Sequence, residues 1–136
     1  MRIVLDTNVL VSALLNPFGV PGRVLDLILA GAVTMVYDDR ILAEYREVLL
    51  RPRFGFEKQQ VQRLLEYLTF TGEGVSASPL NAEAPDADDL PFAEVTVSGN
   101  ADALVTGNPA HFAFMTQMPV LSPAEFLQLW LKRRGT

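Results

Sequence analysis

Cysteine is absent from this chain of 136 residues. Its absence excludes disulfide bonds and thiolate metal sites, so any bound metal ion would have to sit on oxygen ligands. A chain without cysteine also suits a reducing compartment, and we expect a cytoplasmic protein.

Basic residues are few: 11 lysines and arginines face 16 acids, which gives a net charge of −5. This balance argues against a sequence-independent grip on phosphate backbones. Acids that gather at one metal site would weaken the argument, because a bound cation reverses the local field.

Long apolar runs are also missing. The longest stretches, 3–15 and 24–37, are too short or are broken by polar residues and glycine, whereas a membrane span needs about 20 apolar residues. Asp6 stands where the apolar region of a signal peptide would lie, so we expect none. The composition, 49% hydrophobic and 20% charged, and the length predict a single globular domain over residues 1–136.

Strand and helix signals alternate along the chain. We expect strands at 2–5, 33–37, near Val75, at 103–106 and at 119–121. We expect helices at 9–15, around 24–29, from Asp38 or Asp39 to the residues before Pro52, at 57–71, from Asp88 or Asp89 through Thr96, and from Pro123 onward. Strands separated by helices predict an α/β fold with a central parallel sheet that helices cover on both faces.

Asp6 is the most informative residue because it ends the first buried strand. Aspartate is disfavoured in strands, and open α/β sheets bind ligands beyond the carboxyl ends of their strands. The sequence offers no turn that requires an acid here, so we interpret Asp6 as functional.

Other acids are predicted near the same edge of the sheet, and each has a simpler explanation when taken alone. Glu44 could be a surface residue that pairs with Arg40 or Arg51. Asp86, Asp88 and Asp89 could serve turns or helix caps, and Asp102 could simply begin a strand. Together they form the oxygen-rich arrangement that Mg²⁺ or Mn²⁺ requires.

Four motifs carry a resemblance that runs over nearly the whole chain. They are Val4-Leu5-Asp6-Thr7-Asn8-Val9-Leu10-Val11-Ser12, Ile41-Leu42-Ala43-Glu44-Tyr45, Pro85-Asp86-Ala87-Asp88-Asp89-Leu90-Pro91-Phe92, and Ala101-Asp102-Ala103-Leu104-Val105-Thr106-Gly107-Asn108 followed by His111-Phe112. In this order they resemble the PIN domain family, in particular its small bacterial and archaeal members that are similar to VapC-type ribonuclease toxins of toxin-antitoxin systems.

The resemblance implies a three-layer PIN-like fold and a set of site residues. Metal ligands would be Asp6, Glu44 and Asp89, with Asp102 as a fourth catalytic acid, and Asn8 and Thr106 would support them by hydrogen bonding. Many family members carry aspartate where this chain has Asn108, which leaves the second metal position open because asparagine brings no charge.

The implied activity is Mg²⁺- or Mn²⁺-dependent hydrolysis of RNA phosphodiester bonds, with an antitoxin protein as partner and a homodimer as the assembly. Arg51, Arg53, Lys58 and Arg63 are candidates for phosphate contact, although a solvated basic face explains them equally well. Aromatic residues Phe54, Phe56 and Tyr67 would line a groove for the antitoxin, or serve as core or dimer contacts. We read His111 as a loop residue near the site that takes no catalytic part.

Two other functions stay open. A catalytically weak PIN-fold module that binds RNA or protein would suit Asn108 and the acidic composition, and divalent-dependent nuclease activity separates it from the enzyme. A receiver-like domain, phosphorylated on one aspartate, would also gather acids around Mg²⁺. It lacks a suitably placed lysine near the last strands, and labelling with acetyl phosphate would test it.

Overall fold

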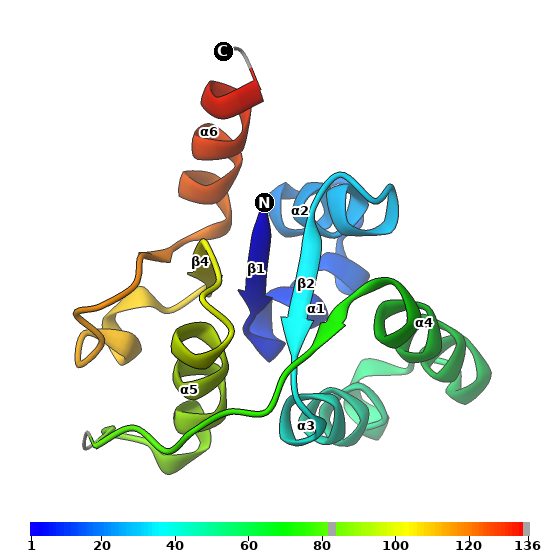
Figure 1. Cartoon of the computed structure of the whole chain (residues 1–136). Coiled ribbons are helices and arrows are strands. Elements are labelled where there is room, and N and C mark those ends of the chain that lie inside the picture. Colours follow the sequence, from blue (N-terminus) through cyan, green and yellow to red (C-terminus); the bar gives the residue numbers. More distant parts are fainter. Residues whose placement is uncertain (82–83, 135–136) are drawn as a thin grey trace.

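One five-stranded sheet forms the centre of the molecule. The computed structural model describes residues 1–81 and 84–134, and in this part of the chain all strand pairs are parallel, in the order β3-β2-β1-β4-β5 (Figure 1). The strands are β1 (Arg2–Leu5), β2 (Thr34–Tyr37), β3 (Glu73–Gly74), β4 (Ala103–Val105) and β5 (Val120–Leu121).

Helices flank the sheet on both faces and complete a three-layer α/β fold, as expected from the sequence. They are α1 (Thr7–Leu15), α2 (Val20–Leu29), α3 (Asp39–Leu49), α4 (Lys58–Thr71), α5 (Leu90–Ser98) and α6 (Pro123–Arg134), with short 3₁₀ turns η1 (Pro52–Phe54), η2 (Ala87–Asp89) and η3 (Pro109–Phe112). Every predicted strand and helix occurs, with bounds that differ by a few residues.

Local sequence explains where the helices begin and end. The Asp38 side chain accepts from the Ile41 amide at 3.0 Å and caps α3. Ser122 and Glu125 form the expected reciprocal capping box at the start of α6. At the end of α4, Gly72 lies against the backbone of β2, where a Cβ atom would stand 2.6 Å from the Met35 carbonyl oxygen. Only glycine fits this close approach.

The core lies between the sheet and its helices. β1 is buried from Ile3 to Leu5, and α5 packs on β1, β2 and β4. Tyr45 of α3 is fully buried, donates a hydrogen bond to the Leu5 carbonyl and contacts the ring of Phe92 on α5. These contacts fix α3 and α5 against the end of β1.

The register brings three strand ends to one edge of the sheet, which we call the carboxyl edge. Leu5 pairs with Val105, and Ile3 pairs with Met35, so Asp6, Thr106 and Asp38 follow β1, β4 and β2 at this edge. The chain leaves β1 toward β2 on one side and later returns to β4 on the other. The carboxyl edge between β1 and β4 is therefore a topological switch point, where α/β folds place ligands.

Within the described ranges, no helix combines the length and the apolar character needed to cross a membrane.

Candidate metal-binding active site

Asp6 joins the end of β1 to the start of α1 and is only 9% exposed. Its Oδ1 accepts from the Thr7 amide at 2.8 Å, and its Oδ2 accepts from the Thr106 hydroxyl at 2.7 Å. Burial raises the pKa of Asp6, although these two hydrogen bonds and His111 oppose the shift. Asp6 is also the N-cap of α1, a structural role that the sequence reasoning missed.

Glu44 is partly buried in the second turn of α3, and the Thr7 hydroxyl donates to its Oε2. Burial raises the pKa of Glu44, and the charges of Asp6 and of the acids before α5 raise it further. The alternative of a surface glutamate paired with a nearby arginine does not hold. Arg40 pairs with Asp38 and Glu94, and Arg51 pairs with Glu47.

Asp89 stands at the N-cap position of α5, but its side chain makes no capping hydrogen bond. Its Oδ2 is buried and has no hydrogen-bond partner in the described part of the chain. Burial raises the pKa of Asp89, with further contributions from Asp6 and Asp86. Helix capping therefore does not account for this partly buried carboxylate, whereas Asp86 does accept from the Asp88 amide, at 2.9 Å.

Three elements thus bring Asp6, Glu44 and Asp89 within electrostatic reach of one another, and we call these residues the acidic cluster. Asp6 contributes to the raised pKa of both other members. Across residues 1–81 and 84–134, no three acidic or histidine side chains converge closely enough to hold a metal ion without rearrangement. A buried carboxylate oxygen that accepts no hydrogen bond and lies among like charges nevertheless fits a divalent cation, which prefers oxygen ligands.

His111 lies beside the acidic cluster, on the η3 turn, as the sequence interpretation placed it. Its Nδ1 is 4.0 Å from Asp89 Oδ2, and its side chain is 58% exposed. Its Nε2 lies 3.3 Å from the side-chain nitrogen of Asn108. The imidazole lowers the pKa of Asp6 and of Asp89, so it offsets part of the mutual repulsion.

A loop after β4 supports Asp6. The Thr106 hydroxyl, while donating to Asp6, accepts from the Asn108 amide at 3.0 Å. The Asn8 side-chain oxygen accepts from the Gly107 amide at 3.1 Å and links α1 to the same loop. Asn8, Thr106 and Asn108 are therefore brought to the carboxyl edge together with Asp6.

Asp102 does not lie beside the acidic cluster. The sequence interpretation placed it there as a fourth catalytic acid, and this placement is wrong. Ile3 pairs with Ala103, so Asp102 lies at the amino edge of the sheet. There it accepts from the Arg2 amide at 2.8 Å and lies 3.8 Å from Arg133. Residues before and after a parallel strand lie at opposite edges, separated here by about 10 Å of strand.

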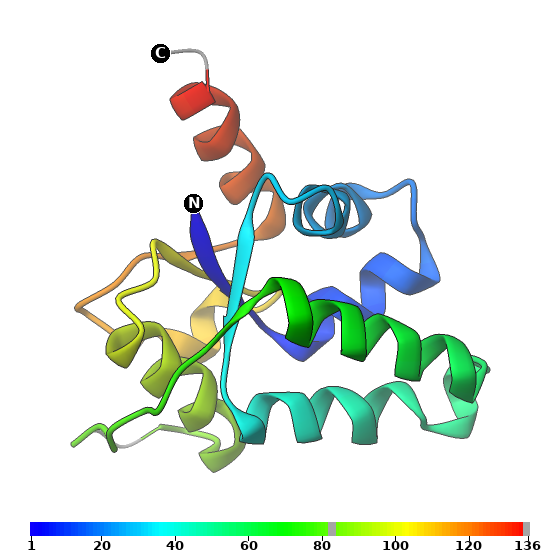
Figure 2. The same cartoon turned by 45° about the vertical axis from the view of Figure 1, so that its right-hand side comes forward.

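Three of the four basic candidates lie at the turn between α3 and α4, and Arg63 lies farther along α4. Arg51 pairs with Glu47, the Arg53 guanidinium lies 4.7 Å above the Phe54 ring, and Lys58 begins α4. Figure 2 shows this turn at the end of the helix pair farther from β2. These residues are thus not beside the acidic cluster.

The aromatic candidates separate as well. Phe54 and Phe56 stack at 5.8 Å and pack against the core. Tyr67 donates instead to the Leu29 carbonyl at the end of α2. The three residues do not line one groove.

Sequence reasoning missed Arg40 and Glu94, which join α3 to α5. The signal was present, since Glu94 interrupts the apolar run from Phe92 to Val95 in a helix that packs on the sheet. A charged residue in such a run predicts a buried partner.

The chain is similar to known proteins in both sequence and fold. The model of the PIN domain family matches residues 2–110. Uncharacterized protein MJ1680 of Methanocaldococcus jannaschii is 34% identical over 112 residues, which cover 79% of this chain and 71% of that protein.

Two solved structures share the fold, each with a TM-score of 0.60. VapBC-1 from nontypeable Haemophilus influenzae is 22% identical, and the match covers 91% of this chain and 99% of that chain. The second structure is VapBC2 from Rickettsia felis, bound to a DNA fragment from its promoter. It is 20% identical, and the match covers 90% of this chain and 98% of that chain.

Proposed function

Because the chain belongs to the PIN domain family, we propose that it is a divalent-metal-dependent ribonuclease whose active site is the acidic cluster. One observation carries the proposal: the buried Oδ2 of Asp89 accepts no hydrogen bond in the described residues, while Asp6 and Glu44 raise the local negative charge. A cation would satisfy this oxygen and offset the repulsion among the three carboxylates.

In this proposal the carboxylates of Asp6, Glu44 and Asp89 hold Mg²⁺ or Mn²⁺. The bound ion would supply charge stabilisation at the scissile phosphate and an activated water. Thr106 fixes one oxygen of Asp6, and Thr7 fixes one oxygen of Glu44, so each hydroxyl orients a ligand. Asn108 stands beside the site without a charge, which favours one tightly held ion over two.

RNA remains the proposed substrate. Phosphate contact by Arg51, Arg53 and Lys58 would require RNA to extend along α3 from the acidic cluster to the α3–α4 turn. His111 is a nearer cationic candidate when it is protonated, because it is exposed and lies 4.0 Å from Asp89.

We further propose that the protein is the toxin of a toxin-antitoxin pair, acts in the cytoplasm, and forms a homodimer that an antitoxin protein covers. The likeness in fold to the two VapBC structures supports this proposal. Large apolar side chains at the surface, Phe18 and Phe70 above all, offer contact area for partners. Light scattering of the purified chain would give the assembly state, and two copies per particle is the expected result.

A catalytically weak PIN-fold module that binds RNA or protein is the second candidate. The neutral Asn108 and the separation among the carboxylates favour it. Because the chain belongs to the PIN domain family, we no longer consider the alternative of a receiver-like domain.

The test is cleavage of a mixed RNA pool by wild type and by Glu44→Gln, each with Mg²⁺, Mn²⁺ or EDTA. Glu44 makes no backbone capping contact, so its amide variant should fold. Glu66→Gln is the matched control, because Glu66 is an exposed glutamate on α4 that accepts a hydrogen bond from Gln62 of the same helix. We expect metal-dependent cleavage by wild type and the control and none by Glu44→Gln. A folded wild type that is inactive with both metals favours the binding module.

A further inference from the structure

Glu94 is a buried carboxylate outside the acidic cluster. It lies in the middle of α5, is 7% exposed, and has the buried residues Ala93 and Val95 as neighbours. A charge in this environment is expensive unless it is paired and hydrogen-bonded. The contacts of Glu94 therefore show how this charge is stabilised on the helix that follows Asp89.

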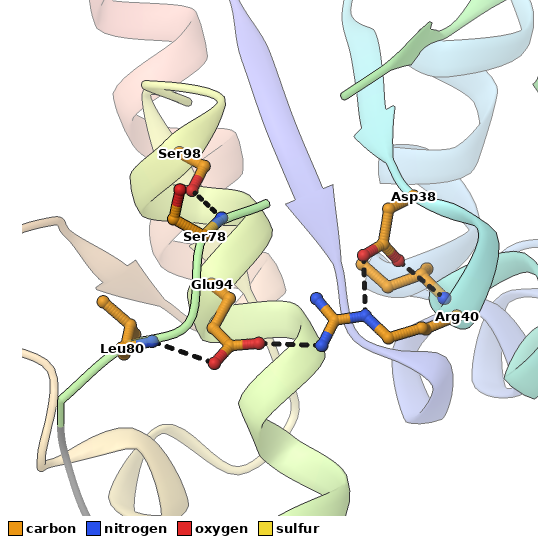
Figure 3. A network of polar contacts seen from close by, with 7 residues as sticks. Asp38, Arg40, Ser78, Leu80, Glu94 and Ser98 are labelled. Atoms are coloured by element: carbon orange, nitrogen blue, oxygen red, sulfur yellow. Dashed lines mark hydrogen bonds and ion pairs between the residues drawn. The ribbon is translucent and has the colours of Figure 1, made fainter. Parts of the chain in front are cut away.

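Arg40 of α3 provides the pairing charge. Its Nη1 donates to Glu94 Oε1 at 2.7 Å, and its Nε donates to Asp38 Oδ2 at 2.8 Å (Figure 3). Asp38 also caps α3, so one guanidinium fork joins the first turn of α3 to the second turn of α5. The two carboxylates hold the pKa of Arg40 above its usual value, and Glu94 contributes most to this shift.

The second oxygen of Glu94 holds the connection between β3 and α5. Oε2 accepts from the Leu80 amide at 2.9 Å, and Ser98 accepts from the Ser78 amide at 2.9 Å (Figure 3). Both anchors lie on α5, so the segment 78–80 is fastened along this helix shortly before the chain reaches Asp89.

The positions of these residues on their helices relate the network to the acidic cluster. Arg40 lies four residues before Glu44, so both project from the same face of α3. Glu94 lies five residues after Asp89 on the helix that Asp89 begins. The Arg40–Glu94 pair therefore spans the two helices that deliver Glu44 and Asp89.

We propose that Arg40 and Glu94 are positioning residues that set the separation between Glu44 and Asp89 for divalent-metal binding. The proposal rests on the ribonuclease function proposed above. Neither residue touches the metal or the RNA in this account. They act by holding α3, α5 and the segment 78–80 in one arrangement, so that the rearrangement needed to bring the two carboxylates onto one ion is confined to their side chains.

If the Arg40–Glu94 pair only stabilised the fold, Mn²⁺ affinity would return to the wild-type value whenever stability returned. Arg40 is 47% exposed in its side chain, so the ion pair itself should add little to stability. Removing Arg40 alone would still be costly, because it would leave the Glu94 charge buried and unpaired. A double variant that also neutralises Glu94 removes this cost but not the loss of the bridge.

The experiment compares Arg40→Ala, Glu94→Gln and Arg40→Ala/Glu94→Gln with wild type. Mn²⁺ affinity is measured from the paramagnetic resonance signal of the free ion, stability by thermal unfolding, and RNA cleavage as kcat and KM. Glu73→Gln is the matched control, because it also removes one partner of an arginine–glutamate ion pair. This pair joins Arg2 of β1 to Glu73 of β3 and includes no residue of α3 or α5.

We expect Arg40→Ala to lose both stability and Mn²⁺ affinity. The double variant should regain stability over Arg40→Ala while its Mn²⁺ affinity stays at least about tenfold below wild type. Arg40→Lys, which keeps the charge but not the two-pronged contact, should recover only part of the affinity. Equal Mn²⁺ affinity in the double variant and wild type would overturn the proposal.

The two proposals fail in different ways. A wild type that binds Mn²⁺ but cleaves no RNA contradicts the ribonuclease function, and the affinities of the variants still decide the positioning role. A wild type that binds no Mn²⁺ overturns both proposals.

Discussion

Replacing Asp89 by asparagine should make the metal-free protein more stable while it removes the response to metal. The side chain is 15% exposed, and its Oδ2 accepts no hydrogen bond in the described residues; His111 Nδ1 lies 4.0 Å away. Burial and the neighbouring acids both oppose the charged form. Asparagine keeps the shape and removes the charge, so Asp89→Asn should relieve both costs.

The magnitude follows from the charge that the substitution removes. An unsatisfied buried polar group costs about 1–3 kcal/mol and a charged one more, and asparagine removes only the part due to the charge, which the partial exposure of Asp89 keeps small. We therefore expect the metal-free variant to gain about 1 kcal/mol in free energy of unfolding near neutral pH. For a domain of this size the unfolding midpoint should rise by roughly 3–5 °C.

The sign of the pH dependence provides an internal check. The folded-state pKa of Asp89 is raised above its ordinary value of 3.8, so the native state holds this proton more tightly than the unfolded state does. The loss of folding free energy that the charged Asp89 causes in wild type is complete above the raised pKa. It shrinks as the pH falls from the raised pKa toward 3.8, and it is absent below pH 3.8. The advantage of Asp89→Asn should shrink in the same interval.

Metal reverses the order of stability. At a Mg²⁺ concentration about ten times the dissociation constant, wild type should gain about 1.4 kcal/mol and Asp89→Asn much less. Thermal unfolding with and without Mg²⁺, at neutral and acidic pH, measures all of these effects. An Asp89→Asn protein that is less stable than wild type without metal, or that Mg²⁺ stabilises equally, would refute the reasoning.

Three other substitutions test the supporting contacts. Thr106→Val removes the hydroxyl that binds Asp6 and the Asn108 amide, and chemical denaturation should show a loss of about 1–2 kcal/mol together with weaker Mn²⁺ binding. Asn108→Asp adds a carboxylate beside the site, so calorimetry should show tighter Mn²⁺ binding and lower metal-free stability, and unchanged values would contradict this. Tyr45→Phe leaves the buried Leu5 carbonyl without its donor, so stability should fall by about 1 kcal/mol. Its Mn²⁺ affinity should fall less than that of Thr106→Val, because the Tyr45 hydroxyl hydrogen-bonds to the Leu5 carbonyl and the Met35 sulfur and not to a carboxylate of the acidic cluster.

The fold was predictable because its signals are local. Apolar strands, capping residues and helix-ending glycines lie in short stretches of sequence, as Gly31 after α2 illustrates with its φ of 79°. The alternation of strand and helix then limits the topology to a parallel sheet. Element bounds differed where a cap was misjudged: Asp6 begins α1 two residues earlier than the apolar pattern indicated.

The candidate site was predictable only in part, because it depends on which edge of the sheet each residue reaches. Asp6 follows its strand, whereas Asp102 precedes its strand, so the two acids lie at opposite edges of the sheet. The sequence interpretation grouped both acids in one site and did not use this difference. The Arg40–Glu94 bridge joins residues 54 positions apart. The local pattern marks Glu94 as a charge that needs a partner, but it does not identify Arg40 as that partner. The sequence also left open which of Asp86 and Asp89 serves the turn before α5; in the structure Asp86 does so, and Asp89 Oδ2 accepts no hydrogen bond in the described residues.

The central claim is that Asp6, Glu44 and Asp89 share one divalent cation. Crystals of the protein soaked in Mn²⁺ test it most directly, because the anomalous signal of manganese locates the ion. The account predicts one strong peak in contact with oxygens of all three carboxylates, and its absence in crystals of Asp89→Asn. A peak elsewhere on the molecule, or none in wild type, would contradict the account.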